Sequence, residues 1–168
     1  MDLGLSGNVV LVTGAASGMG KAVAQLFGCE GAHVIAADLN ESGARETAES
    51  IVRARGLADA VCLDVTSRAA WSDVIAGVAQ VDVLCNIAGP GARSGQLDTD
   101  DAEWRRQIEG HLTGVFLGCQ SVLPSMMERR AGKIVNMCSF TAHRRDAYRQ
   151  RPYLRAVGER HRKQKLMP

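Results

Sequence analysis

Short apolar runs alternate along this chain with longer segments whose apolar residues recur three and four positions apart. The apolar runs predict five strands, at residues 9–13, 33–38, 60–65, 81–88 and 133–139. Strands that alternate with helices form parallel sheets, because each helix returns the chain to the edge where the next strand begins. Right-handed crossovers then place the first strand at the centre. The pattern predicts an α/β fold, a doubly wound parallel sheet of the Rossmann type.

Four segments between these strands have the spacing of helices with one buried face. We expect them at residues 21–29, 41–55, 68–79 and, after an acidic start at 98–103, as far as about residue 126. In the last segment apolar residues recur three and four apart, at Ile108, Leu112, Val115, Phe116, Cys119, Val122, Leu123 and Met126. This long helix is expected to bury that whole face.

The alternating pattern ends at Ala142, and the charge changes there too. Residues 1–142 hold 11 Lys and Arg against 16 Asp and Glu, whereas residues 143–168 hold 9 against 2. The whole-chain charge of +2 conceals this difference. The sequence therefore predicts a folded domain at 1–142 and a basic, disordered tail at 143–168.

Composition narrows the class of protein. A chain of 168 residues with 46% hydrophobic residues is suited to one globular domain. It has no apolar run of the roughly 20 residues that cross a bilayer, and its start lacks a secretory signal, so we expect a cytoplasmic protein. Its cysteines have no metal-ligand spacing, and we expect reduced thiols and no metal site at Cys29, Cys62, Cys85, Cys119 and Cys138.

The strongest chemical signal is the glycine-rich segment 13–20, TGAASGMG, which follows the first strand. Gly14 permits a sharp turn, and Gly18 and Gly20 permit close approach of a ligand to the backbone. The N–H groups that begin the next helix then face that ligand, as at a pyrophosphate site. The segment predicts a dinucleotide site. An ordinary strand-to-helix bend is the alternative, because the spacing differs from the commoner Gly-x-Gly-x-x-Gly.

Together with segments farther along, this turn resembles the short-chain dehydrogenase/reductase family, over residues 5 to about 142. The resemblance implies that Ser17 and the Met19 backbone lie against the cofactor phosphates and that Asp38 binds the adenine ribose. Asp64 and Val65 look like the pair that flanks the adenine. The set of cofactor-binding residues implied is Gly14, Ser17, Gly18, Met19, Gly20, Asp38, Asp64, Val65, Asn86, Ala88 and Gly89.

The carboxylate of Asp38 favours NAD over NADP. It can accept hydrogen bonds from both ribose hydroxyls but would repel a 2′-phosphate. Neither residues 15–17 nor Leu39 offers a cation for that phosphate. The alternatives are a solvated carboxylate at the strand end for Asp38 and a turn cap for Asp64.

The resemblance also implies a chemistry. In the family a hydride moves between the nicotinamide and an alcohol or carbonyl carbon, and a tyrosine assisted by a lysine exchanges the proton. A serine binds the substrate oxygen, and Ser139 stands at its position as the catalytic residue. His111 stands where the family has an asparagine on the long helix, so we expect either a weakened water relay or a structural histidine.

The Tyr-x-x-x-Lys pair of the family is missing from this sequence. Tyr148 is followed four residues later by Pro152, and Tyr153 by Val157. Two hypotheses therefore stay open: an NAD-dependent oxidoreductase acting on a small alcohol or carbonyl compound, and a truncated, catalytically incompetent relative that binds the dinucleotide. A change of reading frame after codon 142 would account for the tail.

Without the helix that carries this pair, we expect the sheet to be incomplete at its C-terminal side. The long helix would then lack a neighbour, and a homo-oligomer through residues 103–130 is one way to cover it. No nucleic-acid partner is expected, because the basic tail has no interleaved aromatic residues. No membrane partner is expected either.

Overall fold

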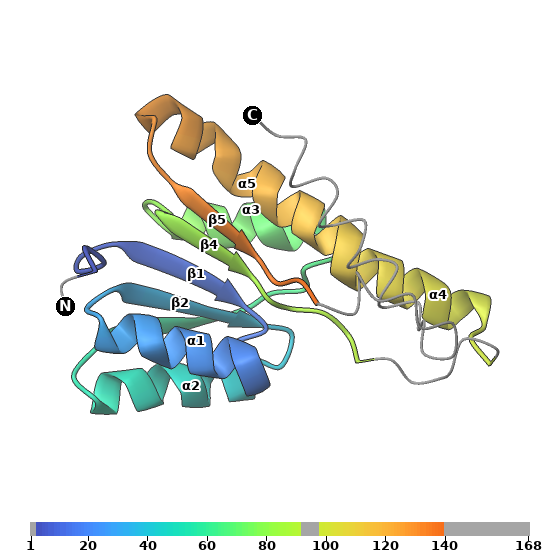
Figure 1. Cartoon of the computed structure of the whole chain (residues 1–168), viewed down its shortest axis with the longest axis horizontal. Coiled ribbons are helices and arrows are strands. Elements are labelled where there is room, and N and C mark those ends of the chain that lie inside the picture. Colours follow the sequence, from blue (N-terminus) through green and yellow to red (C-terminus); the bar gives the residue numbers. More distant parts are fainter. Residues whose placement is uncertain (1–2, 92–97, 140–168) are drawn as a thin grey trace.

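The computed structural model describes residues 3–91 and 98–139. The described residues contain one sheet of parallel strands in the order β3-β2-β1-β4-β5, so β1 is central (Figure 1). The strands are β1 (Val9–Thr13), β2 (His33–Asp38), β3 (Leu57–Cys62), β4 (Val83–Asn86) and β5 (Lys133–Asn136). This order confirms the predicted doubly wound sheet. The predicted tail at 143–168 lies outside the described residues.

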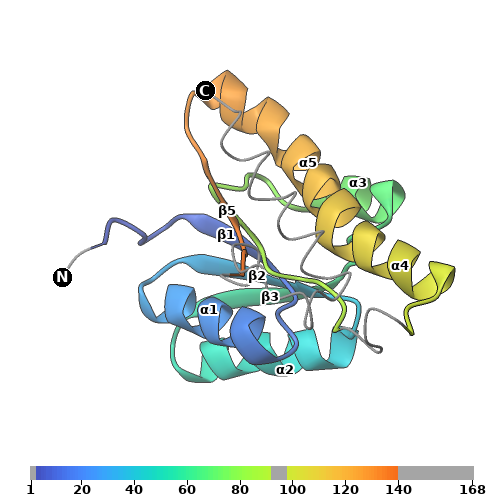
Figure 2. The same ribbon diagram turned by 45° about the vertical axis from the view of Figure 1, so that its right-hand side comes forward.

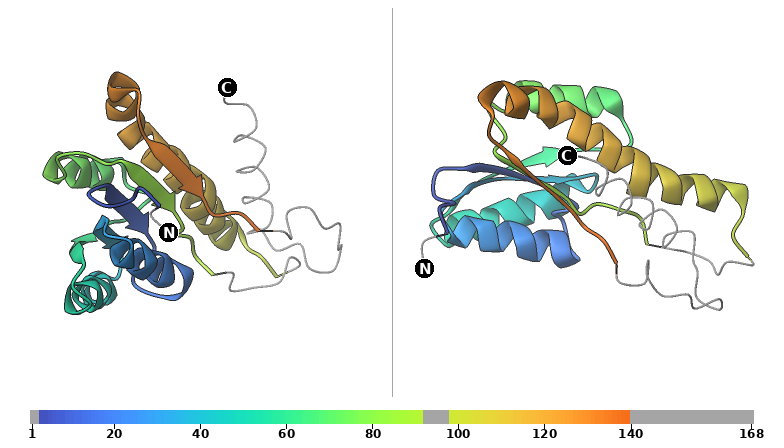
Figure 3. Two further views of the ribbon diagram at one scale, coloured as in Figure 1. Left: turned by 60° about the vertical axis from the view of Figure 1, so that its left-hand side comes forward. Right: turned by 45° about the horizontal axis from the view of Figure 1, so that its top comes forward.

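Helices cover both faces of the sheet (Figure 3). One layer consists of α1 (Gly18–Cys29) and α2 (Glu41–Arg53), and the other of α3 (Arg68–Gly77) and α5 (Gly114–Arg129). Alternate residues of β1 enter the two cores: Val10 and Val12 join the cluster beneath α1 and α2, and Leu11 joins the cluster that contains Trp71. Burial on both faces explains why β1 is apolar from Val9 to Val12.

The long helix is continuous but changes its winding. It consists of α4 (Asp101–Ile108), a π-helical turn η1 (Glu109–Thr113) and α5, which run along one side of the sheet (Figure 2). Within the described ranges, none of the helices is both long and apolar enough to span a bilayer.

The expected burial of Phe116 is wrong, because this side chain is 54% exposed. Gly114 and Gly118 face inward instead, and both are buried. Phe116 is two residues from each of them, about 200° around the helix, and so it points away from the sheet.

The predicted bounds of the third strand are wrong by three residues. The sequence pattern placed it at 60–65, whereas β3 pairs with β2 from Leu57 to Cys62. Asp64 and Val65 lie in the turn that follows, where Asp64 Oδ1 accepts the N–H of Thr66 at 2.9 Å. A carboxylate that bonds its own turn ends the strand earlier than periodicity indicates.

The other elements differ less from the prediction. β4 and β5 are shorter than the predicted 81–88 and 133–139. The first helix begins at Gly18, three residues earlier than expected, and α2 ends at Arg53. Arg55, which follows it, has a φ of 66° and cannot continue a helix.

A half-buried charge pair joins the starts of β1 and β4 to the end of α5. Arg129 donates to Asp82 Oδ1 at 3.0 Å and to the Val81 carbonyl at 2.9 Å. Asp82 Oδ2 also accepts the N–H of Val9 at 2.9 Å. Burial by itself raises the pKa of Asp82, but the hydrogen bonds from Val9, Gln80 and Arg129 together lower it below its ordinary value.

We expect Asp82→Asn to lower the free energy of unfolding at pH 7 by about 1–3 kcal/mol. Because the folded pKa is lowered, this contribution is complete above the unfolded pKa and is lost as the pH falls through the folded value. The difference from wild type should therefore shrink below about pH 4. Urea unfolding at several pH values measures it, with the exposed Asp73→Asn as control. A difference independent of pH would contradict the assignment.

Candidate functional site

The predicted site residues gather at one edge of the sheet. Parallel strands end at the same edge, and Figure 1 shows the strand arrows pointing to it. Residues 14–20 follow β1, Asp38 ends β2, and Asp64 and Val65 come after β3. Residues 86–89 lie at and after the end of β4. Ser139, half-buried, lies three residues beyond β5.

The glycine turn after β1 is packed against backbone. Gly14 has a φ of 75°, and a Cβ there would lie 2.9 Å from the Cα of Ala88. A Cβ at Gly20 would lie 2.0 Å from the carbonyl oxygen of Gly14. Around Gly18, in contrast, a Cβ would meet nothing within 4 Å among the described atoms. The turn is closed on its inner side and open at Gly18.

The start of α1 has no side-chain cap. Ser17 is the N-cap residue, but within the described part of the chain its side chain makes no cap hydrogen bond. The first turn also contains no acidic residue. The N–H groups and the positive end of the helix dipole are thus available to an anion, and the open space at Gly18 lies beside them. These residues fit a pyrophosphate.

Asp38 is held against the glycine turn. Its Oδ2 accepts the N–H of Ala16 at 3.0 Å, and its Oδ1 accepts the N–H of Asn40 at 2.9 Å. The turn is also bonded to β2 directly, since the N–H of Ala15 donates to the Ala37 carbonyl at 3.1 Å. This arrangement disfavours a freely solvated carboxylate. Each oxygen keeps a further lone pair for hydroxyl donors.

Thr13 is a site residue that the sequence analysis missed. Its buried hydroxyl accepts the N–H groups of Ile87 and Ala88, at 3.0 and 3.1 Å, and donates to the Cys85 carbonyl at 3.3 Å. These bonds turn the chain away from the sheet ladder, and β4 therefore ends at Asn86. The signal was a hydroxyl residue that ends a buried apolar run just before the glycine turn.

Asn86 faces the interior rather than the edge. It is 2% exposed, and its Nδ2 donates to Asn136 Oδ1 at 2.8 Å. Its carbonyl accepts the N–H of Met137 at 2.9 Å, which continues the pairing beyond β5. The side chain of Asn86 thus joins β4 to β5, and half-buried Ala88 and exposed Gly89 follow it.

His111 packs against the loop after β4. The ring is 5% exposed, and its Nε2 lies 3.0 Å from the Pro90 carbonyl. Because that oxygen only accepts, Nε2 carries the proton. A Cβ at Gly89 would lie 2.0 Å from Cε1 of the ring. This geometry favours the structural alternative for His111 over a water relay.

Asp64 caps its own turn, as the alternative expectation held, and its Oδ1 also accepts the Thr66 hydroxyl at 2.7 Å. The tyrosines, Tyr148 and Tyr153, lie outside the described residues, so the proton-transfer geometry around Ser139 is not part of the described site.

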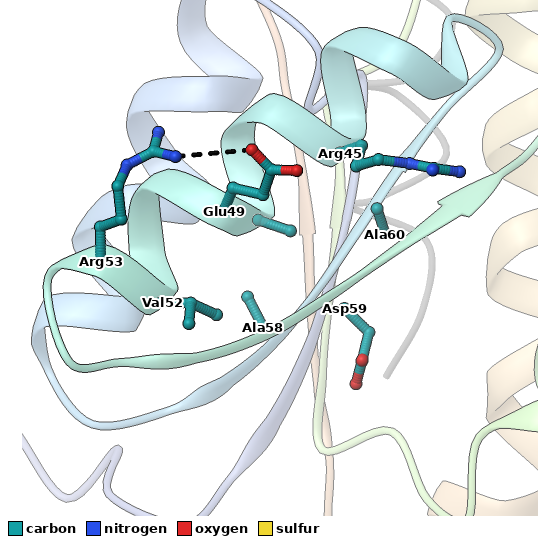
Figure 4. A pocket seen from close by; sticks show the side chains of 8 residues that line it. Arg45, Glu49, Val52, Arg53, Ala58, Asp59 and Ala60 are labelled. Carbon is teal, nitrogen blue, oxygen red and sulfur yellow. Dashed lines mark hydrogen bonds and ion pairs between the residues drawn. The ribbon is translucent and has the colours of Figure 1, made fainter.

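An open groove lies away from this edge, between α2 and β3 (Figure 4). Ala58 and Ala60 line it from β3, and Arg53 pairs across one turn of α2 with Glu49 at 3.4 Å. Charges of both signs line this groove, and none of the predicted site residues does. We assign it no function.

A family model described as short chain dehydrogenase matches residues 8–153, which extends past residue 142. D-threitol dehydrogenase of Mycolicibacterium smegmatis is 37% identical over 145 residues, which are 84% of this chain and 56% of that protein. The 3-oxoacyl-acyl-carrier-protein reductase of Thermotoga maritima is 41% identical over 143 residues, which are 80% of this chain and 56% of the reductase.

A solved structure is similar over most of the described chain. A metagenomic short-chain oxidoreductase in complex with NADP has a TM-score of 0.84 at 31% identity. The match covers 91% of this chain and 71% of that one. The chain spans slightly more than half the length of the two dehydrogenase and reductase relatives.

Proposed function

Because this chain belongs to the short-chain dehydrogenase/reductase family, we propose that its sheet edge binds NAD(H) for oxidoreduction of a small alcohol or carbonyl compound. The observation that supports this most directly is the Asp38 carboxylate, held by two backbone N–H groups beside the uncapped start of α1. An anion site and a fixed hydroxyl acceptor at adjacent strand ends are what an adenosine diphosphate requires.

In this proposal each segment has one task. The N–H groups at the start of α1, with Ser17 and Met19, hold the pyrophosphate, and Gly18 leaves room for it. Asp38 accepts the hydroxyls of the adenine ribose, and Asp64 and Val65 lie beside the adenine. Ala88 and Gly89 lie beside the ribose, and Ser139 binds the substrate oxygen. When bound, NAD(H) supplies or accepts the hydride.

We propose NAD rather than NADP as the cofactor. Members of the family use either, and one similar structure holds NADP. In this chain the Asp38 carboxylate would repel a 2′-phosphate. Residues 15–17 and Leu39, which are nearest in sequence to the two strand ends, supply no cation to offset that repulsion.

Calorimetric titration tests both parts of the proposal. We expect NADH to bind at least about tenfold more tightly than NADPH, because only NADPH brings a phosphate against the Asp38 carboxylate. Asp38→Ser should weaken NADH binding and remove most of that preference, because the serine neither repels the phosphate nor accepts two hydroxyls. The exposed Asp73→Asn should change neither affinity. No heat with millimolar NADH, or tighter binding of NADPH, would overturn the proposal.

Dinucleotide binding without turnover is the second candidate function. Two observations favour it: the absence of a Tyr-x-x-x-Lys pair from the sequence, and the burial of His111 against Pro90. A phenol with its ordinary pKa near 10 is a poor base at neutral pH unless a cation lies beside it. Oxidation of NADH with a panel of ketones distinguishes the two candidates, because only the oxidoreductase exceeds the blank without enzyme.

A further inference from the structure

Trp71 lies behind the turn at Asp64 and Val65. It is in the first turn of α3 and is completely buried. Its indole N–H donates to the Val65 carbonyl at 3.0 Å. A buried indole N–H needs an acceptor, and here the acceptor is the backbone of a predicted adenine-flanking residue rather than of the core.

The glycine row of α5 closes the other side of this contact. A Cβ at Gly114 would lie 2.9 Å from Cγ2 of Val65, and a Cβ at Gly118 would lie 2.8 Å from Cζ2 of Trp71. Only glycine at these positions lets the helix approach so closely. Val65, which is half-buried, therefore lies between the indole and α5.

The Asp64 side of the turn is also fixed, but by local bonds. Asp64 Oδ1 accepts both the N–H and the hydroxyl of Thr66. The N–H of Leu63 donates to the Asp38 carbonyl at 2.9 Å, which joins this turn to the end of β2. The indole of Trp71 adds a side-chain bond to the same turn from α3, at the Val65 carbonyl.

We propose that Trp71 is a positioning residue for the adenine: its indole N–H fixes the Asp64–Val65 turn so that this turn discriminates the edge of the purine. The inference rests on the proposed function. In it, the Asp64 carboxylate accepts the 6-amino group of adenine, and Trp71 holds the backbone that directs that carboxylate. A tryptophan that only fills the core would support the fold without affecting the choice of base.

The test replaces the N–H while keeping the shape. The chain has two tryptophans, Trp71 and Trp104. In a Trp104→Phe background, growth on β-(3-benzothienyl)alanine replaces Trp71 alone with a side chain of nearly equal size in which sulfur stands for N–H. Trp71→Phe is the second variant, and the Trp104→Phe protein with ordinary tryptophan is the matched control.

The readout is a ratio of two affinities, for NADH and for reduced nicotinamide hypoxanthine dinucleotide, which lacks the 6-amino group. We expect the control to prefer NADH and both Trp71 variants to lose about threefold to tenfold of that preference, the worth of one hydrogen bond. Loss of folded protein alone would weaken both ligands equally and leave the ratio unchanged.

An unchanged ratio in the variants overturns the role of Trp71 and leaves the proposed function intact. A control that binds both dinucleotides equally also overturns the role of Trp71, because the turn then does not distinguish adenine from hypoxanthine. A control that binds neither ligand overturns the proposed function, and the inference with it.

Discussion

Gly20→Ala is expected to weaken NADH binding by at least about 100-fold, close to loss of detectable binding. The added Cβ would lie 2.0 Å from the carbonyl oxygen of Gly14 and 3.1 Å from the N of Ala15. Both neighbours are backbone atoms, which no change of rotamer can move. Either the turn opens or α1 shifts, and both displace the N–H groups proposed to hold the pyrophosphate.

Fluorescence titration with NADH measures this loss, and thermal unfolding followed by circular dichroism shows what part of the protein stays folded. Gly77→Ala is the matched control, because a Cβ at Gly77 would meet nothing within 4 Å among the described atoms. It should bind NADH as wild type does. If Gly20→Ala bound NADH within about threefold of wild type, the turn would not be the phosphate site.

The second large effect concerns stability at the contact between Gly89 and His111. A Cβ at Gly89 would lie 2.0 Å from Cε1 and 2.2 Å from Nδ1 of the ring. The ring cannot withdraw easily, because it is buried and bonded to the Pro90 carbonyl. We expect Gly89→Ala to lower the free energy of unfolding by about 2–4 kcal/mol.

A double-mutant cycle isolates this contact. His111→Ala alone should also destabilise, because it leaves a cavity and an unpaired carbonyl. In the double variant the new methyl group has the space of the ring, so the summed losses should exceed the measured one by about 1–3 kcal/mol. Urea unfolding gives all three values. Gly91→Ala, whose Cβ would meet no described atom within 4 Å, is the control. Additive losses would contradict the contact.

The arrangement of the sheet could be predicted because it depends on regular features. Each apolar run at 9–13, 33–38 and 81–88 contains an observed strand, and right-handed crossovers on either side of the first strand give the observed doubly wound sheet. The gathering of the glycine turn, Asp38 and residues 86–89 at one edge follows directly, since parallel strands end together. These predictions needed only periodicity and chirality.

The details of the site depend on single contacts that periodicity does not reveal. Val61, Leu63 and Val65 alternate as a strand would, yet the Asp64 carboxylate bonds Thr66 and turns the chain. The hydroxyl of Thr13 bonds two N–H groups more than 70 residues away in sequence. Such contacts are set by tertiary packing, which one sequence does not display.

The glycines of the long helix have a mechanical consequence. Gly110 touches the ring of Pro90, Gly114 touches Val65, and Gly118 touches Trp71. Through these contacts the long helix touches both the loop after β4 and the turn after β3, although β2 and β1 lie between those two strands in the sheet. A tilt of the helix would therefore move both loops together, and a substitution that strains the contact at Pro90 should also shift the turn at Val65.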